Sequence, residues 1–381
     1  MIERRDYQLK VISPLHIGSG ETLLQATDFV TLNQRVFVFD QPSFLQELSR
    51  RGIVTLYARE LGASGRNFIL RDFLQRHNLL KEDFLKTVSR YQIPARGSPR
   101  EIRAFIKTLG RPFVPGSSVK GALRVGMLYR LLKELGEPFL KEYVWKGIEE
   151  EIGQLSRLSG QDRRKKRNQL RRKLGQFVDD LLRLFRLKGD SRDPRTDLLR
   201  CVKVCDSSPL DPSRLAVTKV QVSKLKGEGS TSLWVEALIP KTAFRIIIEV
   251  DHDLLQFFAR ENTKVKLPVR DVEVPFELYQ RFFSEPFSPA VSLVKDLIEE
   301  EKVRLPESWL RFTEPVNFRL GWGQGLLSAA LFLLLPQDLR KRLRNELFKD
   351  EGAAEAPLTR KVSNSGLMGF CQVGFIKRRH E

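Results

Sequence analysis

One segment of the chain contains residue types that suit the binding of an anion. A Pro-Gly pair is followed by Ser117 and Ser118, and apolar residues then recur at helical spacing. We expect Ser118 to cap this helix, because serine accepts hydrogen bonds from the free N–H groups of a first turn. Those N–H groups and the helix dipole attract anions, and Lys120 and Arg124 would share the adjacent helical face. The residues alone fit a phosphate site and an ordinary capped helix with two solvated cations equally well.

A second candidate is a loop in which glycines alternate with larger residues. It consists of Gly321, Trp322, Gly323, Gln324 and Gly325, ahead of an apolar run. Such a loop can expose a row of backbone N–H groups to a phosphate. Trp322 could stack on a base, which is worth ~1–3 kcal/mol. The alternative is a tight turn with the tryptophan in the core, and the loop by itself favours that alternative.

The third candidate lies at residues 13–21, after the first predicted strand, and contains His16, Gly18 and Gly20. The glycines allow positive φ and close approach. His16 could donate to a phosphate or act in acid–base chemistry, and the alternative is a loop histidine satisfied by the protein itself. The sequence shows no Ser/His/Asp set, no cluster of metal ligands and no Walker-type loop. We therefore predict no catalytic residue, metal or cofactor, and do not expect an enzyme.

The composition points to a polyanionic partner. Lysine and arginine total 66 against 47 acidic residues, which gives a formal net charge of +19. Such an excess attracts nucleic acid first and an anionic membrane surface second. The basic run at residues 163–173 contains no acid, and it is either an RNA-facing helix or a solvated helical face.

Cysteine usage and hydropathy indicate a cytoplasmic protein. The three cysteines, Cys201, Cys205 and Cys371, are too few and too scattered for a disulfide framework, and we expect buried thiols in a reducing compartment. No signal peptide is visible. The longest apolar run, residues 326–335, is about half the ~20 residues that a membrane-spanning helix needs, so it predicts a core helix.

Hydrophobic periodicity predicts an α+β protein of two domains, residues 1–190 and 191–381. Residues 7–11 alternate as a strand, and residues 36–39 are its expected partner. Predicted helices cover 44–50, 68–90, 118–135, 140–187, 277–283, 289–302 and 326–335. Further predicted strands cover 202–204, 220–222, 233–237, 244–250 and 369–376.

Three segments, in this order, resemble the RAMP superfamily of CRISPR-associated proteins. They are residues 13–20, 115–124 and 320–325. The best match is to the family of fifth subunits of type III-A (Csm) effector complexes. Softer matches at 204–207, 234–236, 242–244 and 359–360 spread the resemblance over nearly the whole chain.

The resemblance implies tandem ferredoxin-like domains of the RNA-recognition type, the first with a helical insertion and the second with the glycine-rich loop. It implies a non-catalytic subunit that caps the 3′ end of the guide RNA and assists its maturation and complex assembly. The implied partners are guide RNA, target RNA indirectly, a backbone RAMP subunit and a small helical subunit. A recruited host nuclease is a further candidate partner, and no membrane is implied.

The resemblance also assigns roles to single residues. Four match positions expected near RNA: His16, Ser117, Lys120 and Arg124. Residues 223–229 match the hairpin that backbone relatives wedge between bases, where Lys224 and Lys226 would hold phosphates and Leu225 would pack on a base.

Two enzymatic alternatives remain open. In a RAMP endoribonuclease that processes precursor guide RNA, His16 would be the general acid or base. In a backbone-like subunit that cleaves target RNA, Asp28 would stand near the catalytic aspartate, but its spacing and neighbours do not identify it. A third alternative is a protein–protein adaptor whose charge is incidental.

Overall fold

The protein is described from a computed structural model. The structure describes residues 1–183, 194–224, 230–261, 263–267, 272–329, 331–348 and 359–380. Of the predicted hairpin at 223–229, residues 225–229, including Leu225 and Lys226, lie outside the described residues. Among the described residues, no helix is both long and apolar enough to cross a bilayer.

The first large sheet has five strands in the order β15-β18-β1-β12-β9. Its strands are β1 (Ile2–Val11), β9 (Val202–Val204), β12 (Ala243–Asp251), β15 (Phe318–Arg319) and β18 (Phe370–His380). Tyr7, Leu9 and Val11 point into the core, as their alternation predicts. The predicted partner of β1 is wrong, however, because β1 pairs antiparallel with β12 and β18 rather than with residues 36–39.

The second large sheet has six strands in the order β17-β16-β10-β11-β6-β2. They are β2 (Gly18–Leu24), β6 (Glu101–Phe105), β10 (Leu215–Lys224), β11 (Ser230–Leu238), β16 (Thr359–Ser363) and β17 (Gly366–Leu367). Strands β10 and β11 form a long antiparallel hairpin, while β6 runs parallel to β11. Both large sheets contain strands from either side of residue 190, so the predicted domain division does not separate one sheet from the other.

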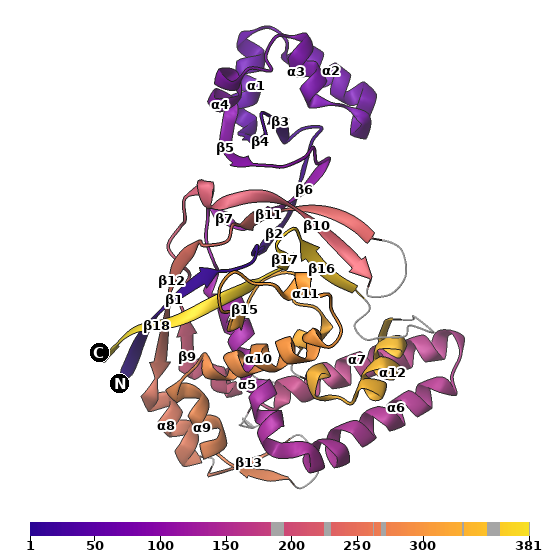
Figure 1. The fold of residues 1–381 in the computed structure, drawn as a ribbon, viewed down its shortest axis with the longest axis vertical. Helices are drawn as coiled ribbons and strands as arrows, with labels where there is room; N and C mark the ends of the chain where they lie inside the picture. Colours follow the sequence, from indigo (N-terminus) through magenta and orange to yellow (C-terminus); the bar gives the residue numbers. More distant parts are fainter. Residues whose placement is uncertain are drawn as a thin grey trace.

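A small lobe projects from the body, at the top of Figure 1. It contains β3 (Phe29–Leu32), β4 (Arg35–Phe39), β5 (Ser89–Pro94), α1 (Gln41–Arg50), α2 (Val54–Ser64), α3 (Leu70–Arg76) and α4 (Glu82–Val88). Positive φ angles at Asn33 and Gln34 form the tight turn that pairs β3 with β4. The lobe buries its own cluster of aromatic and aliphatic side chains. Phe37 and Phe39 therefore contribute to a separate core, whereas Val36 and Val38 pack in the main core.

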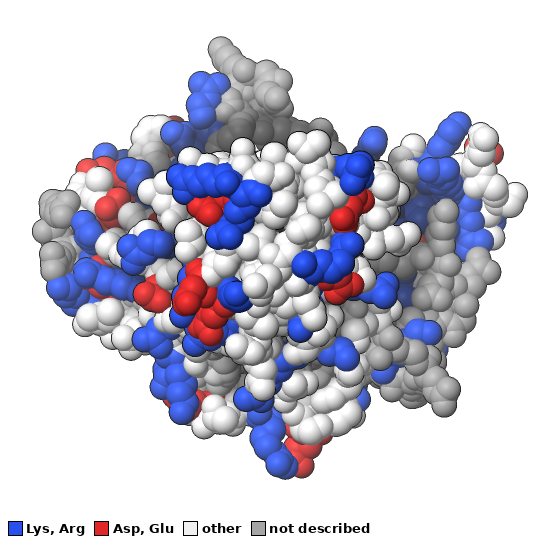
Figure 2. All heavy atoms as spheres, turned by 90° about the horizontal axis from the view of Figure 1, so that it is seen from above, with Lys and Arg blue, Asp and Glu red and all other residues white. Residues whose placement is uncertain are grey.

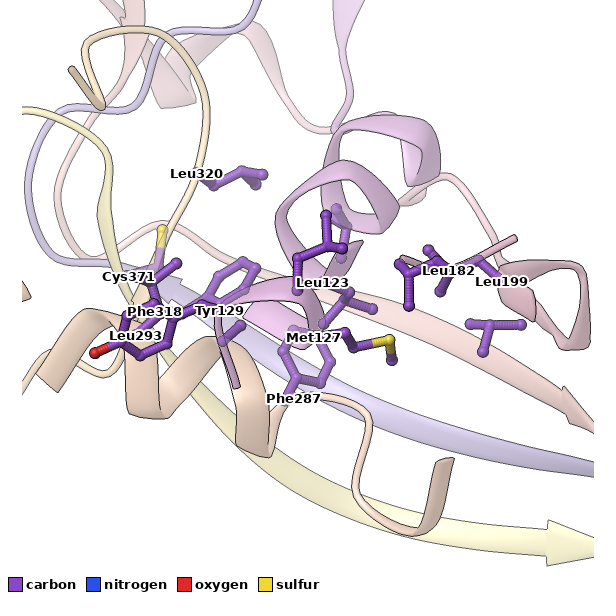
Figure 3. Close-up of a cluster of buried hydrophobic side chains, with 14 of the residues drawn as sticks. Leu123, Met127, Tyr129, Leu182, Leu199, Phe287, Leu293, Phe318, Leu320 and Cys371 are labelled. Atoms are coloured by element: carbon purple, nitrogen blue, oxygen red, sulfur yellow. The ribbon is translucent and has the colours of Figure 1, made fainter. Parts of the chain in front are cut away.

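Helix α5 (Gly116–Phe139) packs between the first sheet and helix α10 (Ser288–Lys302). Figure 3 shows its Leu123 and Met127 among side chains from several other elements. A Cβ at Gly126 would collide with the backbone of Ala290, so glycine permits this close helix crossing. Gly136, at φ 82°, interrupts the helix close to its predicted end.

The remaining helices cover the lower part of the body. They include the π-helical turn η2 (Leu140–Trp145) and the α-helices α6 (Lys146–Ser156), α7 (Gly160–Asp180), α8 (His252–Glu261), α9 (Glu277–Ser284) and α12 (Gln337–Phe348). The short helix α11 (Glu307–Leu310) lies higher, against β17. Short 3-10 turns are η1 (Gly65–Asn67), η3 (Pro194–Thr196), η4 (Leu198–Cys201), η5 (Pro212–Arg214), η6 (Leu326–Ser328) and η7 (Phe332–Leu334). Two further strand pairs are β7 (Lys107–Thr108) with β8 (Arg111–Pro112) and β13 (Lys264–Lys266) with β14 (Glu273–Pro275).

Three predicted helices are not continuous. The predicted helix at 140–187 forms η2, α6 and α7, with a break between Ser156 and Gly160. Residues 68–90 form two short helices, because Asn78 adopts a positive φ of 56° between them. The described residues of the apolar run at 326–335 form the turns η6 and η7 and no α-helix. The run is apolar at nearly every position, so it has too few polar positions for their spacing to indicate a helix. Hydropathy alone therefore could not distinguish a buried helix from buried turns.

Candidate nucleic-acid interface

The glycine-rich loop packs directly on the segment that contains His16. The Trp322 N–H donates to the His16 carbonyl oxygen at 2.8 Å. Gly321 has φ 77°, and a Cβ there would collide with the same carbonyl. Glycine is thus required at this position for close approach of two backbones. The fold brings together two of the three predicted motifs, but it uses the Trp322 N–H, one of the groups expected to face phosphate.

A buried arginine supports this loop from below. Arg319 donates through Nη2 to the Gly323 carbonyl at 3.1 Å and through Nη1 to Ser328 Oγ at 3.4 Å. Ser328 Oγ in turn donates to the Gln324 carbonyl at 3.0 Å. Burial lowers the pKa of Arg319 to about 10, so the guanidinium stays charged at neutral pH. Two loop carbonyls therefore face inward and are fixed by hydrogen bonds.

Trp322 lies between two cations on one face of the six-stranded sheet. The Arg103 guanidinium carbon is 5.3 Å from the indole centroid, and Lys361 Nζ is 4.7 Å from it. These are cation–π distances. The indole also packs on Val220 and Met368, so it is partly buried. The alternative of a core tryptophan is therefore partly right.

The two cations retain charge that the protein does not neutralise locally. In the described part of the chain, no ion pair joins Arg103 or Lys361 to a carboxylate. Arg103 is exposed on β6 and Lys361 is half-buried on β16. Burial and the nearby arginine charges lower the pKa of Lys361, as expected for a cation without a partner. An approaching phosphate would relieve this repulsion.

A surface hollow of about 490 Å³ continues from Arg103. Arg100 and Trp234 also line it, and Lys219 Nζ is 5.9 Å from the Trp234 ring centroid. Trp234 alternates with Val235, which pairs with Arg103 and packs with Trp322, so the Trp234 side chain leaves β11 on the opposite face of the sheet. We call the surface formed by Lys361, Trp322, Arg103 and Arg100 the basic strip, and Trp234 lies at the hollow beside it. Alternating cations and aromatic rings are typical of surfaces that bind single-stranded nucleic acid.

Sequence reasoning missed Arg100, Arg103, Lys361 and Trp234 as binding residues. The available signal was weak. Arg103 alternates with buried Ile102 and Ala104, which indicates only an exposed strand position. Its proximity to Trp322 depends on sheet pairing between segments far apart in the chain.

His16 itself is buried, with 3% of its surface exposed. Its Nδ1 lies 2.6 Å from the Glu236 carbonyl oxygen, and a Cβ at Gly18 would lie 3.1 Å from its Nε2. Burial lowers the pKa of His16, so the ring is neutral at pH 7. This geometry favours the alternative of a histidine satisfied inside the protein, while Gly18 is exposed at the start of β2.

Beside His16 lies a buried carboxylate that holds three elements together. The Glu236 side chain accepts from the Tyr91 hydroxyl at 2.7 Å and from the Phe105 N–H at 2.7 Å. It also forms an ion pair with Lys107. Burial, followed by the Glu236 charge, raises the pKa of Tyr91 far above its usual value. The network ties β5 of the small lobe to β6 and β11 of the second sheet.

The helix start at residues 115–118 differs from its prediction. Pro115, not Ser118, is the N-cap, and no side chain of the cap accepts a hydrogen bond. Instead the Gly116 N–H donates to Asp206 Oδ1 at 2.7 Å. A protein carboxylate thus already occupies the anion site that the helix terminus offers. Ser117 is exposed beside it.

Lys120 and Arg124 are bound to protein acceptors. Lys120 Nζ donates to the Val202 carbonyl at 2.8 Å, and burial lowers its pKa. Arg124 pairs with Asp197 at 2.6 Å and with Asp179 at 3.4 Å. They face a side of α5 different from the one that lines a small cavity with Arg319 and Gln324. The structure therefore does not join them to the glycine-rich loop.

Only some of the remaining basic candidates are free to bind a phosphate. Lys224 is exposed at the end of β10, and Lys226 lies outside the described residues. In the basic run on α7, Lys166 and Lys173 both pair with Glu151. The run is thus partly a packed helical face.

Asp28 lines a cleft of about 450 Å³ between the small lobe and the body. Its carboxylate accepts from the Leu24 N–H at 2.7 Å and from the Thr27 hydroxyl at 2.9 Å. These bonds stabilise a turn, so a structural role explains why an aspartate occupies this position. Within the described ranges, no group of three or more His, Cys, Asp or Glu side chains is arranged to hold a metal ion.

The cysteines and the surface charge complete this description. Cys201 and Cys371 are buried free thiols, and burial raises the pKa of each to about 12. Cys205 is exposed, contrary to its prediction, because it follows the end of the short strand β9. On the face shown in Figure 2, basic and acidic side chains are intermixed. Net charge alone therefore does not locate a binding surface there.

Comparison with known proteins agrees with the three motifs. The model of the RAMP superfamily matches residues 8–328. A curated relative, "CRISPR system Cms protein Csm5" from Streptococcus thermophilus, is 22% identical over 222 residues. That match covers 55% of this chain and 53% of the relative, so the chain spans about half the length of the relative that it matches.

Two solved structures share the fold. A chain of the cryo-EM structure of a Csm–crRNA–target RNA ternary complex from a type III-A CRISPR-Cas system is 25% identical, with a TM-score of 0.69, over 98% of this chain and 100% of that chain. The crystal structure of T. onnurineus Csm5 is 23% identical, with a TM-score of 0.64, over 96% of this chain and 99% of that chain. Since the family model covers most of the residues, the chain belongs to the RAMP superfamily.

Proposed function

We propose that this protein is a non-catalytic, RNA-binding subunit of a type III-A CRISPR (Csm) effector complex in the cytoplasm. The observation that carries the proposal is Trp322 between Arg103 and Lys361, where two family motifs meet. The likeness over nearly the full length to a chain of a Csm–crRNA–target RNA complex supports it. Within that complex, we propose that it caps the 3′ end of the guide RNA and assists maturation and assembly.

The basic strip supports binding through phosphates with a contribution from stacking. Arg103 and Lys361 lack carboxylate partners in the described ranges, so each can neutralise a phosphate and release counterions. Trp234 has one ring edge against Gly97, where a Cβ would collide with the indole. Its remaining surface lines the 490 Å³ hollow and could contact a base. Contacts to phosphates and stacking on aromatic rings carry little sequence information, which suits a guide of any sequence.

The test is RNA affinity of the Arg103→Ala/Lys361→Ala variant. Each lost phosphate contact on a single strand flattens the plot of log K against log salt by about 0.7, so the double variant should lose about 1.4 units of slope. Lys81→Ala/Arg59→Ala, on the small lobe, removes the same charge and should leave the slope nearly unchanged. Equal slopes for the two double variants would overturn the proposed site.

The capping role makes a separate prediction about assembly. We propose as partners a backbone RAMP subunit and a small helical subunit, with target RNA contacted indirectly and a host nuclease recruited. Complexes purified without this protein should then contain guides with longer, uneven 3′ ends. Guides of unchanged length would refute the role in maturation but not RNA binding.

The two enzymatic alternatives have less support. His16 is buried and neutral, and Asp28 is bonded to its own turn. Asp28 does line a cleft, which is the observation in favour of target cleavage. Incubation with precursor guide RNA in EDTA, and with target RNA in Mg²⁺, tests both. Cleavage abolished by His16→Ala or by Asp28→Asn would replace the non-catalytic proposal.

We also propose that the two large sheets are the two ferredoxin-like units. Around the first sheet, the order β1, α5, β9, β12, α8–α10, β18 is strand–helix–strand–strand–helix–strand, the order of a ferredoxin-like unit with insertions. The second sheet would then form the other unit, with its strands interleaved along the chain.

A further inference from the structure

Strand β18 has an open edge over its last residues. One of its edges pairs with β1, and the other pairs with β15 only at Phe370 and Cys371. The Asn317 side chain extends that contact to the backbone of Val373 at 3.0 and 2.7 Å. From Gly374 to His380, no strand in the described part of the chain pairs with this edge. Figure 1 shows this end of β18 at the margin of the body, beside the start of β1.

The open edge also carries large apolar side chains. Phe375 is 56% exposed and Ile376 is 49% exposed, although the Phe375 ring touches Tyr7 at a centroid distance of 5.6 Å. Ile376 is the extra residue of a β-bulge, because the register with β1 shifts there. An open strand edge presents N–H and C=O groups at regular spacing, and another extended peptide completes such a row.

The charges on this edge discriminate among possible occupants. Lys377 is exposed, and no ion pair joins it to a carboxylate among the described residues, whereas Arg378 pairs with Glu3 at 2.6 Å. Pairing of two copies of β18 would bring like charges together, which destabilises a strand pair. An RNA chain does not offer alternating donors and acceptors at the ~3.4 Å rise of a strand. A peptide with acidic side chains meets both requirements.

We propose that the open edge of β18 binds an extended, acidic segment of another protein by strand addition. The backbone from Gly374 onward would form the hydrogen bonds, Phe375 and Ile376 would contact apolar side chains of the segment, and Lys377 would pair with its carboxylates. The edge belongs to the first sheet, whereas Arg103 and Lys361 belong to the second. The inference is therefore independent of the proposed RNA site.

The experiment uses the full chain and two capped peptides of about seven residues, one alternating glutamate with valine and the other lysine with valine. Fluorescence anisotropy measures affinity, and hydrogen exchange locates the protected amides. The acidic peptide should bind and slow exchange from residue 374 to 380. Lys377→Glu should weaken the acidic peptide by about fivefold or more and favour the basic one. Lys203→Glu, on the edge strand β9 across the same sheet, is the matched control and should change neither affinity.

Several results would overturn the inference. They are binding of the acidic peptide without protection at 374–380, an equal loss in Lys203→Glu and Lys377→Glu, or no preference between the peptides. Protection of the same amides by a single-stranded oligonucleotide alone would assign the edge to RNA. Protection that rises with protein concentration alone would assign it to a second copy of this chain.

Discussion

Replacing Lys120 by methionine separates its sequence-based role from its structural one. The family motif places Lys120 at RNA, whereas the structure bonds its Nζ to the Val202 carbonyl at 2.8 Å. Methionine keeps the apolar stem and removes the donor. The variant therefore leaves a buried carbonyl without a partner and changes little else.

The magnitude follows from two opposing contributions. A hydrogen bond from a charged donor contributes ~1.5–3 kcal/mol, and an orphaned buried acceptor costs a comparable amount. Removing the cation also relieves its desolvation, which the lowered pKa of Lys120 reveals. We therefore expect the free energy of unfolding to fall by about 1–2 kcal/mol. For 381 residues at ~2.1 cal/mol/K per residue, this corresponds to a Tm about 2 °C lower.

Thermal unfolding and RNA affinity should be measured on the same preparations. Arg172→Met, an exposed position on the basic helix α7, is the control and should stay within about 0.5 kcal/mol of the parent. The reasoning is refuted if Lys120→Met keeps the parental Tm while losing RNA affinity as strongly as Arg103→Ala/Lys361→Ala. Lys120 would then face RNA, and its bond to Val202 would not stabilise the fold.

Three further outcomes follow from the geometry. Gly116→Ala should lower the free energy of unfolding in urea by more than about 3 kcal/mol, because the new Cβ collides with the Val204 carbonyl. A variant with the parental stability would show that the helix start is not packed as described. Arg319→Met should lower stability by about 1–3 kcal/mol and also weaken RNA binding, since the glycine-rich loop loses its support; a loss of stability alone would separate the loop from RNA. Burial raises the pKa of Glu3, but hydrogen bonds led by that from Arg5 outweigh it and lower the pKa to about 2. The resulting stability, about 3 kcal/mol, is complete above pH ~4.5 and lost as the pH falls toward 2, and Glu3→Gln should abolish this dependence in acid titrations of unfolding.

The sequence by itself determined several of the elements and the family. Alternation at Tyr7, Leu9 and Val11 predicted β1, and apolar spacing predicted α5 to near Gly136. These patterns are local, because a strand or helix that buries one face must repeat with its own period. The motifs around His16 and Trp322 likewise identified the superfamily without any knowledge of where the two residues lie.

Only the tertiary structure decided which residues meet. Trp322 lies between Arg103 and Lys361 because β6 and β16 belong to one sheet, a pairing that no local pattern encodes. Lys120 faces Val202 because α5 packs on β9, which no local pattern encodes either, although its helical position was predicted. Periodicity fixes which side of an element is buried. The partner that covers that side depends on long-range packing, which is selected by the burial of apolar surface over the whole chain.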